Sequence, residues 1–321
     1  TAFWLESDRM LSLAFSEKSL EVQRNVVIEE FRQRYLNQPY GDAWLNLRPL
    51  SYKVHPYRWP TIGMEISHIE NAQLEDVKSF FKKFYHPGNA ILALSGNITV
   101  GQARQLSEKW FGPIPSGNKP AENWTMEPIQ TQARRMEQSA RVPHFALYKA
   151  WHCSSRKDPQ FYSIDLMTDI LSSGKSSRLF NELVKTQQLF SNISLYAMGD
   201  LDPSMVVAEG KIREGVDPAI AEKALDEQLE KICGENVTHD ELQRVKNKSE
   251  SSSVFGEMNN ANRALNLCYH ELLGDASDVN KQTEHYRAVT ASDIKDVASV
   301  IFKAENSNTL LYIPEKSASH A

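Results

Sequence analysis

Residues 20–31 read LEVQRNVVIEEF, and this stretch carries most of what the sequence predicts. Its apolar residues are spaced as one face of a helix, and the run closes on two adjacent carboxylates, Glu29 and Glu30. We expect the helix to continue to about residue 37, because Pro39–Gly41 then stops it. Position 30 is predicted to lie beside the apolar stripe, while position 29 points elsewhere. The predicted inner face carries Leu20, Val26, Val27, Glu30, Phe31 and, in the last turn, Tyr35.

The composition is that of an ordinary globular protein. The chain has 321 residues, 41% of them hydrophobic, which suits two domains of ordinary size. A formal net charge of −5 gives no reason to expect nucleic acid or an anionic membrane as partner. No apolar run is long enough to span a bilayer, so we expect a soluble protein. The cysteines, Cys153, Cys233 and Cys268, are widely spaced and predict buried thiols, which do not decide between cytoplasm and periplasm.

Residues 113–131 are rich in Pro, Gly, Asn and Ser and form the best candidate linker. Before it, residues 1–112 predict helices and one short buried strand at Ala90–Ser95. The sequence enters a helical pattern at its first residue, and we expect this start to be a cut end. After the linker, residues 132–321 predict two strands, two helices, two strands, five helices and a last strand at Thr309–Ile313. An Asn-containing turn precedes both named strands, a weak internal repeat that suits duplicated domains.

Four stretches resemble the insulinase, pitrilysin and mitochondrial processing peptidase family of zinc metallopeptidases, the inverzincins: residues 4–10 (WLESDRM), 20–41, 174–180 (GKSSRLF) and 262–274 (NRALNLCYHELLG). The resemblance is to bacterial-type members, and it implies an α+β fold of two related domains, each with an antiparallel-rich sheet covered by helices. It implies that residues 1–112 are the C-terminal part of the N-terminal, zinc-ligand domain, which is incomplete here. Residues 132–321 would be the C-terminal, non-catalytic domain, joined to the first by the linker 113–131.

In that family a carboxylate on this helix completes a zinc site, whose other ligands are histidines of an inverted His-x-x-Glu-His motif. Glu30 matches the carboxylate position, and Gln23 stands where the family usually has a supporting glutamate. The nine histidines of this sequence form no such motif, so one ligand is expected here and the other two are not. From the residues alone, the alternative is that Glu30 is a surface residue paired with Arg34.

The resemblance also implies a substrate-binding pair on a late helix, an arginine and a tyrosine seven residues apart. Arg263 matches the arginine, and its guanidinium suits hydrogen bonding to a substrate carbonyl. His270 stands at the tyrosine position and Tyr269 precedes it, so either side chain is a candidate. The alternative is that Arg263 pairs with a neighbouring acid and that Tyr269 belongs to the core.

Two functions follow from the resemblance. In the first, the chain is part of a zinc-dependent metalloendopeptidase that hydrolyses peptides, and it is inactive alone because it lacks His-x-x-Glu-His. In the second, it is a non-catalytic partner subunit or scaffold of a two-chain peptidase of the same family, which Gln23 favours. A helical binding module unrelated to the family is the third alternative. The expected cofactor is zinc in the complete protein and none in this chain alone. The expected partners are a peptide substrate and a second copy, a paired subunit or a missing N-terminal segment.

Overall fold

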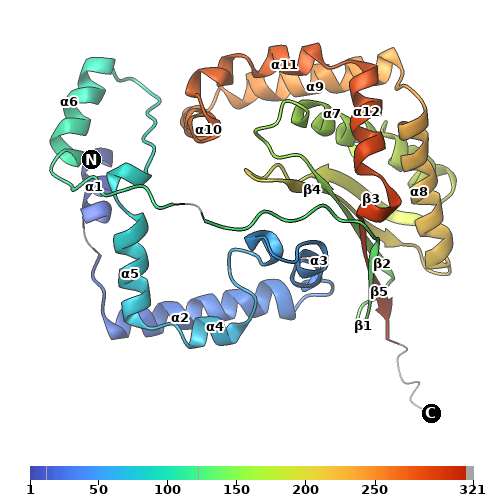
Figure 1. The fold of residues 1–321 in the computed structure, drawn as a ribbon, viewed down its shortest axis with the longest axis horizontal. Coiled ribbons are helices and arrows are strands. Elements are labelled where there is room, and N and C mark those ends of the chain that lie inside the picture. Colours follow the sequence, from blue (N-terminus) through green and yellow to red (C-terminus); the bar gives the residue numbers. More distant parts are fainter. Residues whose placement is uncertain (12, 122, 316–321) are drawn as a thin grey trace. The chain divides into compact units, whose positions relative to one another are not determined.

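The structure, a computed structural model, describes residues 1–11, 13–121 and 123–315 (Figure 1). By its internal contacts the chain divides into two compact units, which we call unit 1 and unit 2. Unit 1 comprises Thr1–Arg32, Ile62–Trp124 and Ser253–Asn280, and unit 2 comprises Gln33–Thr61, Thr125–Ser252 and Lys281–Ala321. Each unit thus combines three separate segments of the chain. The sequence predicted two continuous domains instead, one before and one after the linker at residues 113–131. The assignment of residues 1–112 and 132–321 to two peptidase-type domains stays a prediction.

Unit 1 contains helices and turns, and no strand among its described residues. Its helices are α1 (Ala2–Leu11), α2 (Glu17–Phe31), α4 (Ile66–Glu70), α5 (Leu74–Phe84), α6 (Val100–Phe111) and α10 (Asn260–Leu273). Helix α2 packs against α4, and α1 packs against α6. The guanidinium of Arg24 on α2 donates to the carbonyl oxygen of Ala72, 2.7 Å away, and so ties α2 to the chain just after α4.

The local sequence explains where α2 begins and which face it buries. Ser16 is the N-cap, and it exchanges side-chain and backbone hydrogen bonds with Ser19 in a capping box. Val26, which we predicted on the inner face, is 53% exposed, so that expectation is wrong. Residues three and four apart share a helix face, and the observed stripe follows that spacing. It consists of the half-buried or buried residues Leu20, Arg24, Val27, Ile28 and Phe31.

The prediction of a strand at Ala90–Ser95 is wrong. These residues form neither helix nor sheet, and they pair with no strand in the described part of the chain. Ile91 is 42% and Leu92 50% exposed, although the apolar run predicted burial. A strand exists only through its hydrogen-bonded neighbours, so an apolar run without a partner strand stays irregular. Helix α10 touches the segment at Ile91, whose carbonyl oxygen lies 3.7 Å from the Sγ atom of Cys268.

Unit 2 contains one five-stranded sheet in the order β1-β5-β2-β4-β3. The strands are β1 (Arg134–Ala140), β2 (Ala146–Cys153), β3 (Phe190–Ala197), β4 (Ser204–Ile212) and β5 (Ser307–Pro314). All neighbouring pairs are antiparallel except β1 and β5, which are parallel. The strands predicted beyond the linker are confirmed, including the last one, which lies inside the sheet between β1 and β2.

Helices cover both faces of this sheet (Figure 1). Because neighbouring residues of a strand point to opposite faces, Leu147 and Trp151 of β2 enter one core while Ala146 and Ala150 enter the other. The larger core lies under α7 (Phe161–Ser172), α8 (Pro218–Gly234) and α12 (Ala291–Ile301), and the smaller core lies under α3 (Ala43–Ser51). The remaining α-helices are α9 (His239–Gly256) and α11 (Gln282–Ala288). Residues Arg32–Leu36 and Phe180–Thr186 form π-helical turns. Among the described residues, no helix combines the length and hydropathy needed to cross a membrane.

Helix α3 brings an early segment of the chain onto this late sheet. Ala43 and Leu47 are buried in the smaller core, at 2% and 0% exposure. The hydroxyl of Tyr312 on β5 donates to a carboxylate oxygen of Asp42 at 2.6 Å, and it accepts from the side-chain amide of Asn46 at 3.1 Å. Apolar burial and these polar contacts together explain why residues 33–61 belong to unit 2.

A buried cation lies between the sheet and α8. Lys149 on β2 is 6% exposed, and its Nζ atom is 2.6 Å from Asp226 and 3.3 Å from Glu222, both on α8. Arg135 on β1 also pairs with Glu222, at 2.8 Å. Burying a charge is costly unless it is paired, and these two carboxylates supply the pairing.

Candidate functional site

The two carboxylates that end α2 lie in different environments. The side chain of Glu29 is 56% exposed and pairs with Arg32, one turn later. Glu30 is half-buried, next to the buried Phe31. Neighbouring residues of a helix point about 100° apart, so only one of the pair can lie beside the apolar stripe. Gln23 is exposed. The assignment of Glu30 as a zinc ligand and of Gln23 as its support stays a prediction.

The three candidate substrate-binding residues lie on α10, in the same unit as α2. Arg263 is exposed in the first turns of the helix, and Tyr269 is half-buried. His270 is only 5% exposed, and its Nδ1 atom is 2.9 Å from the carbonyl oxygen of Asn266. That oxygen can only accept, so Nδ1 carries a proton. Of the three residues, Arg263 is the most open to solvent and His270 the least.

A feature of unit 2 that the sequence did not predict surrounds Glu127, in the segment just after unit 1. Its carboxylate accepts three backbone N–H bonds, from Lys53 at 2.8 Å, Val54 at 2.9 Å and His55 at 3.1 Å. Burial alone would raise the pKa of this carboxyl, but the three N–H donors outweigh burial and hold the pKa below its usual range. We call this arrangement the Glu127 clasp. It fastens residues 53–55 to the segment that leads into β1.

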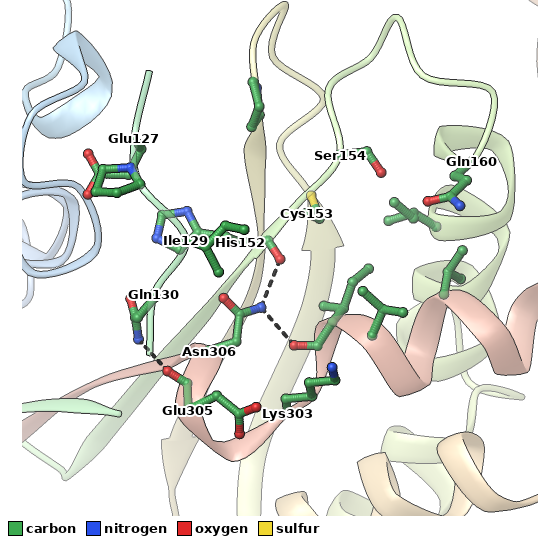
Figure 2. A pocket seen from close by; sticks show the side chains of 16 residues that line it. Glu127, Ile129, Gln130, His152, Cys153, Ser154, Gln160, Lys303, Glu305 and Asn306 are labelled. Atoms are coloured by element: carbon green, nitrogen blue, oxygen red, sulfur yellow. Dashed lines mark hydrogen bonds between the residues drawn. The ribbon is translucent and has the colours of Figure 1, made fainter. Parts of the chain in front are cut away.

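A pocket of about 420 Å³ lies beside the clasp, wholly within unit 2 (Figure 2). Its walls come from residues 127–130, the end of β2, the beginning of α7, the end of α12 and the turn before β5. Figure 2 shows Gln130, His152 and Asn306 on one side of the pocket and Ser154 and Gln160 on the other. The side-chain amide of Asn306 donates to the carbonyl oxygens of His152 and Ile301, both at 2.9 Å, and so joins the ends of β2 and α12.

His152 is neutral in this pocket. Its Nε2 atom donates to the carbonyl oxygen of Ser51 at 3.0 Å, which leaves Nδ1 as an acceptor. Burial, the largest influence, lowers the pKa of His152 in spite of this hydrogen bond. The nine histidines form no motif in the sequence, and no spacing signal in one sequence points to this pocket.

The family described as the peptidase M16 inactive domain matches residues 71–249. The chain belongs to the peptidase M16 family. The zinc protease PqqE of Helicobacter pylori is 27% identical over 317 residues, which cover 97% of this chain and 70% of that protein. The uncharacterized zinc protease YmxG of Bacillus subtilis is 21% identical over 307 residues, covering 95% of this chain and 73% of that protein. A crystal structure of a protease from Helicobacter pylori has a TM-score of 0.90 at 25% identity, covering 98% of this chain and 76% of that one.

These findings confirm the resemblance and the α+β fold of this M16 chain. The fold family implies zinc, and the relatives' names include it. Within the residues that the structure describes, no group of three or more His, Cys, Asp and Glu side chains is arranged to hold a metal ion. A zinc site of the catalytic type needs three protein ligands and an open position. The described residues of this M16 chain therefore do not complete such a site, and its sequence has no inverted motif.

Proposed function

We propose that this M16 chain contributes the carboxylate ligand and the non-catalytic domain of a zinc metalloendopeptidase, and that it hydrolyses no peptide by itself. The supporting observation is Glu30, half-buried on α2 beside an exposed Glu29, in a sequence that has no His-x-x-Glu-His. One carboxylate does not hold zinc against water, so the two histidine ligands have to come from residues outside this sequence. We infer that this chain alone binds no catalytic zinc.

The proposed substrate is a peptide that α10 contacts through Arg263, with Tyr269 or His270 as its second contact. The exposed guanidinium of Arg263 supports the first part, because it is open to solvent and suits a carbonyl acceptor. The burial of His270 means that its ring reaches a peptide only after a local shift of α10.

We also propose that unit 1 is completed by strands from another polypeptide segment, either of the same protein or of a paired subunit. The exposed Ile91 and Leu92 support this, since they line a pocket of about 420 Å³ together with residues of α1, α5 and α6. An added strand would supply the missing hydrogen bonds of residues 90–95 and cover these side chains. The two relatives named above are bacterial, which supports a bacterial protein, of the cytoplasm or the periplasm.

The second candidate is a non-catalytic partner subunit of a two-chain M16 peptidase. Gln23 favours it, because an uncharged side chain at the supporting position weakens a zinc site even when the histidines are present.

Metal analysis of the complete protein tests the proposal and separates the two candidates. With the first candidate, the complete protein holds stoichiometric zinc, Glu30→Gln removes zinc and peptidase activity together, and Glu29→Gln changes neither. With the second candidate, the complete protein and its partner complex hold zinc only in the partner. Stoichiometric zinc and chelator-sensitive proteolysis by this chain alone would overturn both. Equal effects of the two substitutions would show that the ligand is assigned to the wrong residue.

A further inference from the structure

The end of α9, residues 246–256, buries no side chain. The structure describes all of α9, and its buried residues, Leu242 and Val245, both precede this end. Val254 and Phe255, near its last turn, are 60% and 70% exposed. Most of the stability of a protein helix comes from packing of an apolar face, and the end of α9 lacks that packing.

The sequence of this end also favours a helix only weakly. It reads KNKSESSSVFG and contains four serines, of which Ser251 and Ser252 are exposed. Serine, asparagine and valine are poorer helix formers than alanine, and glycine is poorer still. Serine side chains also compete for the backbone groups that a helix would use. Neither packing nor intrinsic propensity therefore accounts for the helical end of α9.

Charged side chains hold the end of α9 in place. The ammonium of Lys248 is 2.8 Å from the carboxylate of Asp169 on α7, and Glu250 pairs with Arg287 on α11 (Figure 1). The Nζ atom of Lys246 donates to the carbonyl oxygen of Arg287 at 2.8 Å. The side chains of Lys248, Glu250 and Arg287 are 49%, 38% and 60% exposed. Exposed ion pairs stabilise a fold only weakly and are screened by salt, so these contacts open easily.

This end of α9 is also where the chain leaves unit 2. The border between the units falls between Ser252 and Ser253, and α10 begins at Asn260. Only residues 257–259 separate the two helices. Three residues span at most about 11 Å, so a change at the end of α9 moves the start of α10.

We propose that residues 246–256 are a conformational joint, which unwinds and reforms locally and thereby releases or holds α10. Local opening of this kind involves the parts of a fold that have few buried contacts. The charged contacts of α9 with α7 and α11 hold the joint wound. A released α10 can make the shift that would bring His270 to a peptide. That consequence rests on the proposed function, whereas the joint itself does not.

Hydrogen exchange of the full chain, followed by mass spectrometry, measures the opening of the joint. We expect the amides of residues 249–256 to exchange about two- to fivefold faster in about 1 M than in about 0.05 M KCl, because salt screens the exposed pairs. The amides of α12, which packs in the larger core, are the reference and should keep their rate. An unchanged rate at residues 249–256, or an equal change in α12, overturns the proposal.

Two glutamate variants test the charged contacts. Glu250→Gln removes the ion pair with Arg287, and we expect exchange at residues 249–256 to be about two- to fivefold faster in low salt. Glu227→Gln is the matched control, because this exposed carboxylate pairs with Lys223 within α8 and joins no two helices. The control should exchange as the parent does. Equal rates in Glu250→Gln and the parent, or an equal rise in both variants, contradict the joint.

A serine variant tests the joint in the opposite direction. Ser251→Ala combined with Ser252→Ala keeps every charge and raises the helix propensity of the joint. Exchange at residues 249–256 should therefore be about fivefold slower than in the parent. If this double variant exchanges as fast as the parent, local unwinding does not limit exchange there and the proposal fails.

The release of α10 is measured at the ring of His270. Diethyl pyrocarbonate modifies accessible histidines, and mass spectrometry of the digested chain gives the rate at His270 relative to the exposed His239. Because His270 is 5% exposed, we expect its rate to be at least about twofold faster in Glu250→Gln and slower in the serine variant. Equal rates in all three proteins would show that the joint does not release α10. The measurement uses neither zinc nor peptide, so its failure is distinct from a failure of the proposed function.

Discussion

Removing the carboxylate of the clasp should loosen the early segment from unit 2. In Glu127→Ala, the N–H groups of Lys53, Val54 and His55 lose their acceptor. Lys53 and Val54 are exposed, so water replaces the carboxylate there at little cost. His55 is 2% exposed, and its N–H is left unsatisfied, which costs about 1–3 kcal/mol. For a unit of this size, a loss of about 2 kcal/mol lowers the melting temperature by roughly 4–8 °C.

Calorimetry measures the melting temperature, and amide hydrogen exchange shows which residues are destabilised in Glu127→Ala. We expect faster exchange at residues 53–55 and unchanged exchange in α7. Glu127→Gln should cost less than the alanine variant, because the Oε2 position alone serves Val54 and His55 and an amide oxygen can occupy it. Glu305→Ala is the control, since that carboxylate is exposed and only its backbone carbonyl is used, by Gln130.

The pH dependence of the clasp has a definite sign. The folded pKa of Glu127 lies below its ordinary value of 4.5, so its stabilisation is present above about pH 4.5 and is lost as the pH falls through the lowered value. The difference between the parent and Glu127→Ala should therefore shrink in acid. Equal melting temperatures of parent and variant at pH 7, or equal losses in Glu127→Ala and Glu305→Ala, would refute this reasoning.

Three further substitutions test other contacts. Lys149→Met leaves two carboxylates of α8 without their shared cation and should lower the free energy of unfolding by about 2–4 kcal/mol in urea denaturation. Arg178→Lys removes a bidentate hydrogen-bonded pair with Glu241, and this pair lowers the pKa of Glu241 to about 2. We expect the free energy of unfolding to fall by about 1–2 kcal/mol at pH 7. This difference should fade as the pH falls from about 4.5 toward 2. Gly117→Ala places a Cβ atom 2.5 Å from the ring of His86, at a residue whose φ is +65°. We expect it to lower the free energy of unfolding of unit 1 by about 2 kcal/mol. An unchanged melting curve would count against the contact.

The strands and helices beyond the linker could be predicted because their signals are local. Apolar runs and helical spacing lie within each element, as in β4 and α12, and Gly or Pro turns separate the elements. Helix α3 was missed because it is short and contains Pro49, so its buried positions at Ala43 and Leu47 give too few repeats to recognise. The prediction of a strand at Ala90–Ser95 was wrong for the opposite reason. Its composition indicates a strand, but composition does not supply a partner strand.

The candidate site was predictable only as far as helix geometry reaches. The half-burial of Glu30 beside an exposed Glu29 agrees with the predicted orientation, because adjacent residues cannot share a face. The exact stripe was not predictable, since Arg24 belongs to it through a hydrogen bond to the distant Ala72. Glu127 in its linker looks like an ordinary surface acid, and its three donors lie more than seventy residues away. Contacts of this separation leave no trace in a single sequence.

The contact between Asp42 and Tyr312 spans 270 positions of the chain. Unit 2 therefore cannot be complete during synthesis until Tyr312 has been made. A ribosome that adds about 5–20 residues per second makes Tyr312 roughly 14–54 s after it has made Asp42. For that interval α3 lacks one part of the sheet that it packs against, because Leu310 and Tyr312 of β5 belong to the smaller core together with residues of β2 and β4. The nascent chain thus passes through a stage in which the apolar side of residues 43–51 is only partly covered.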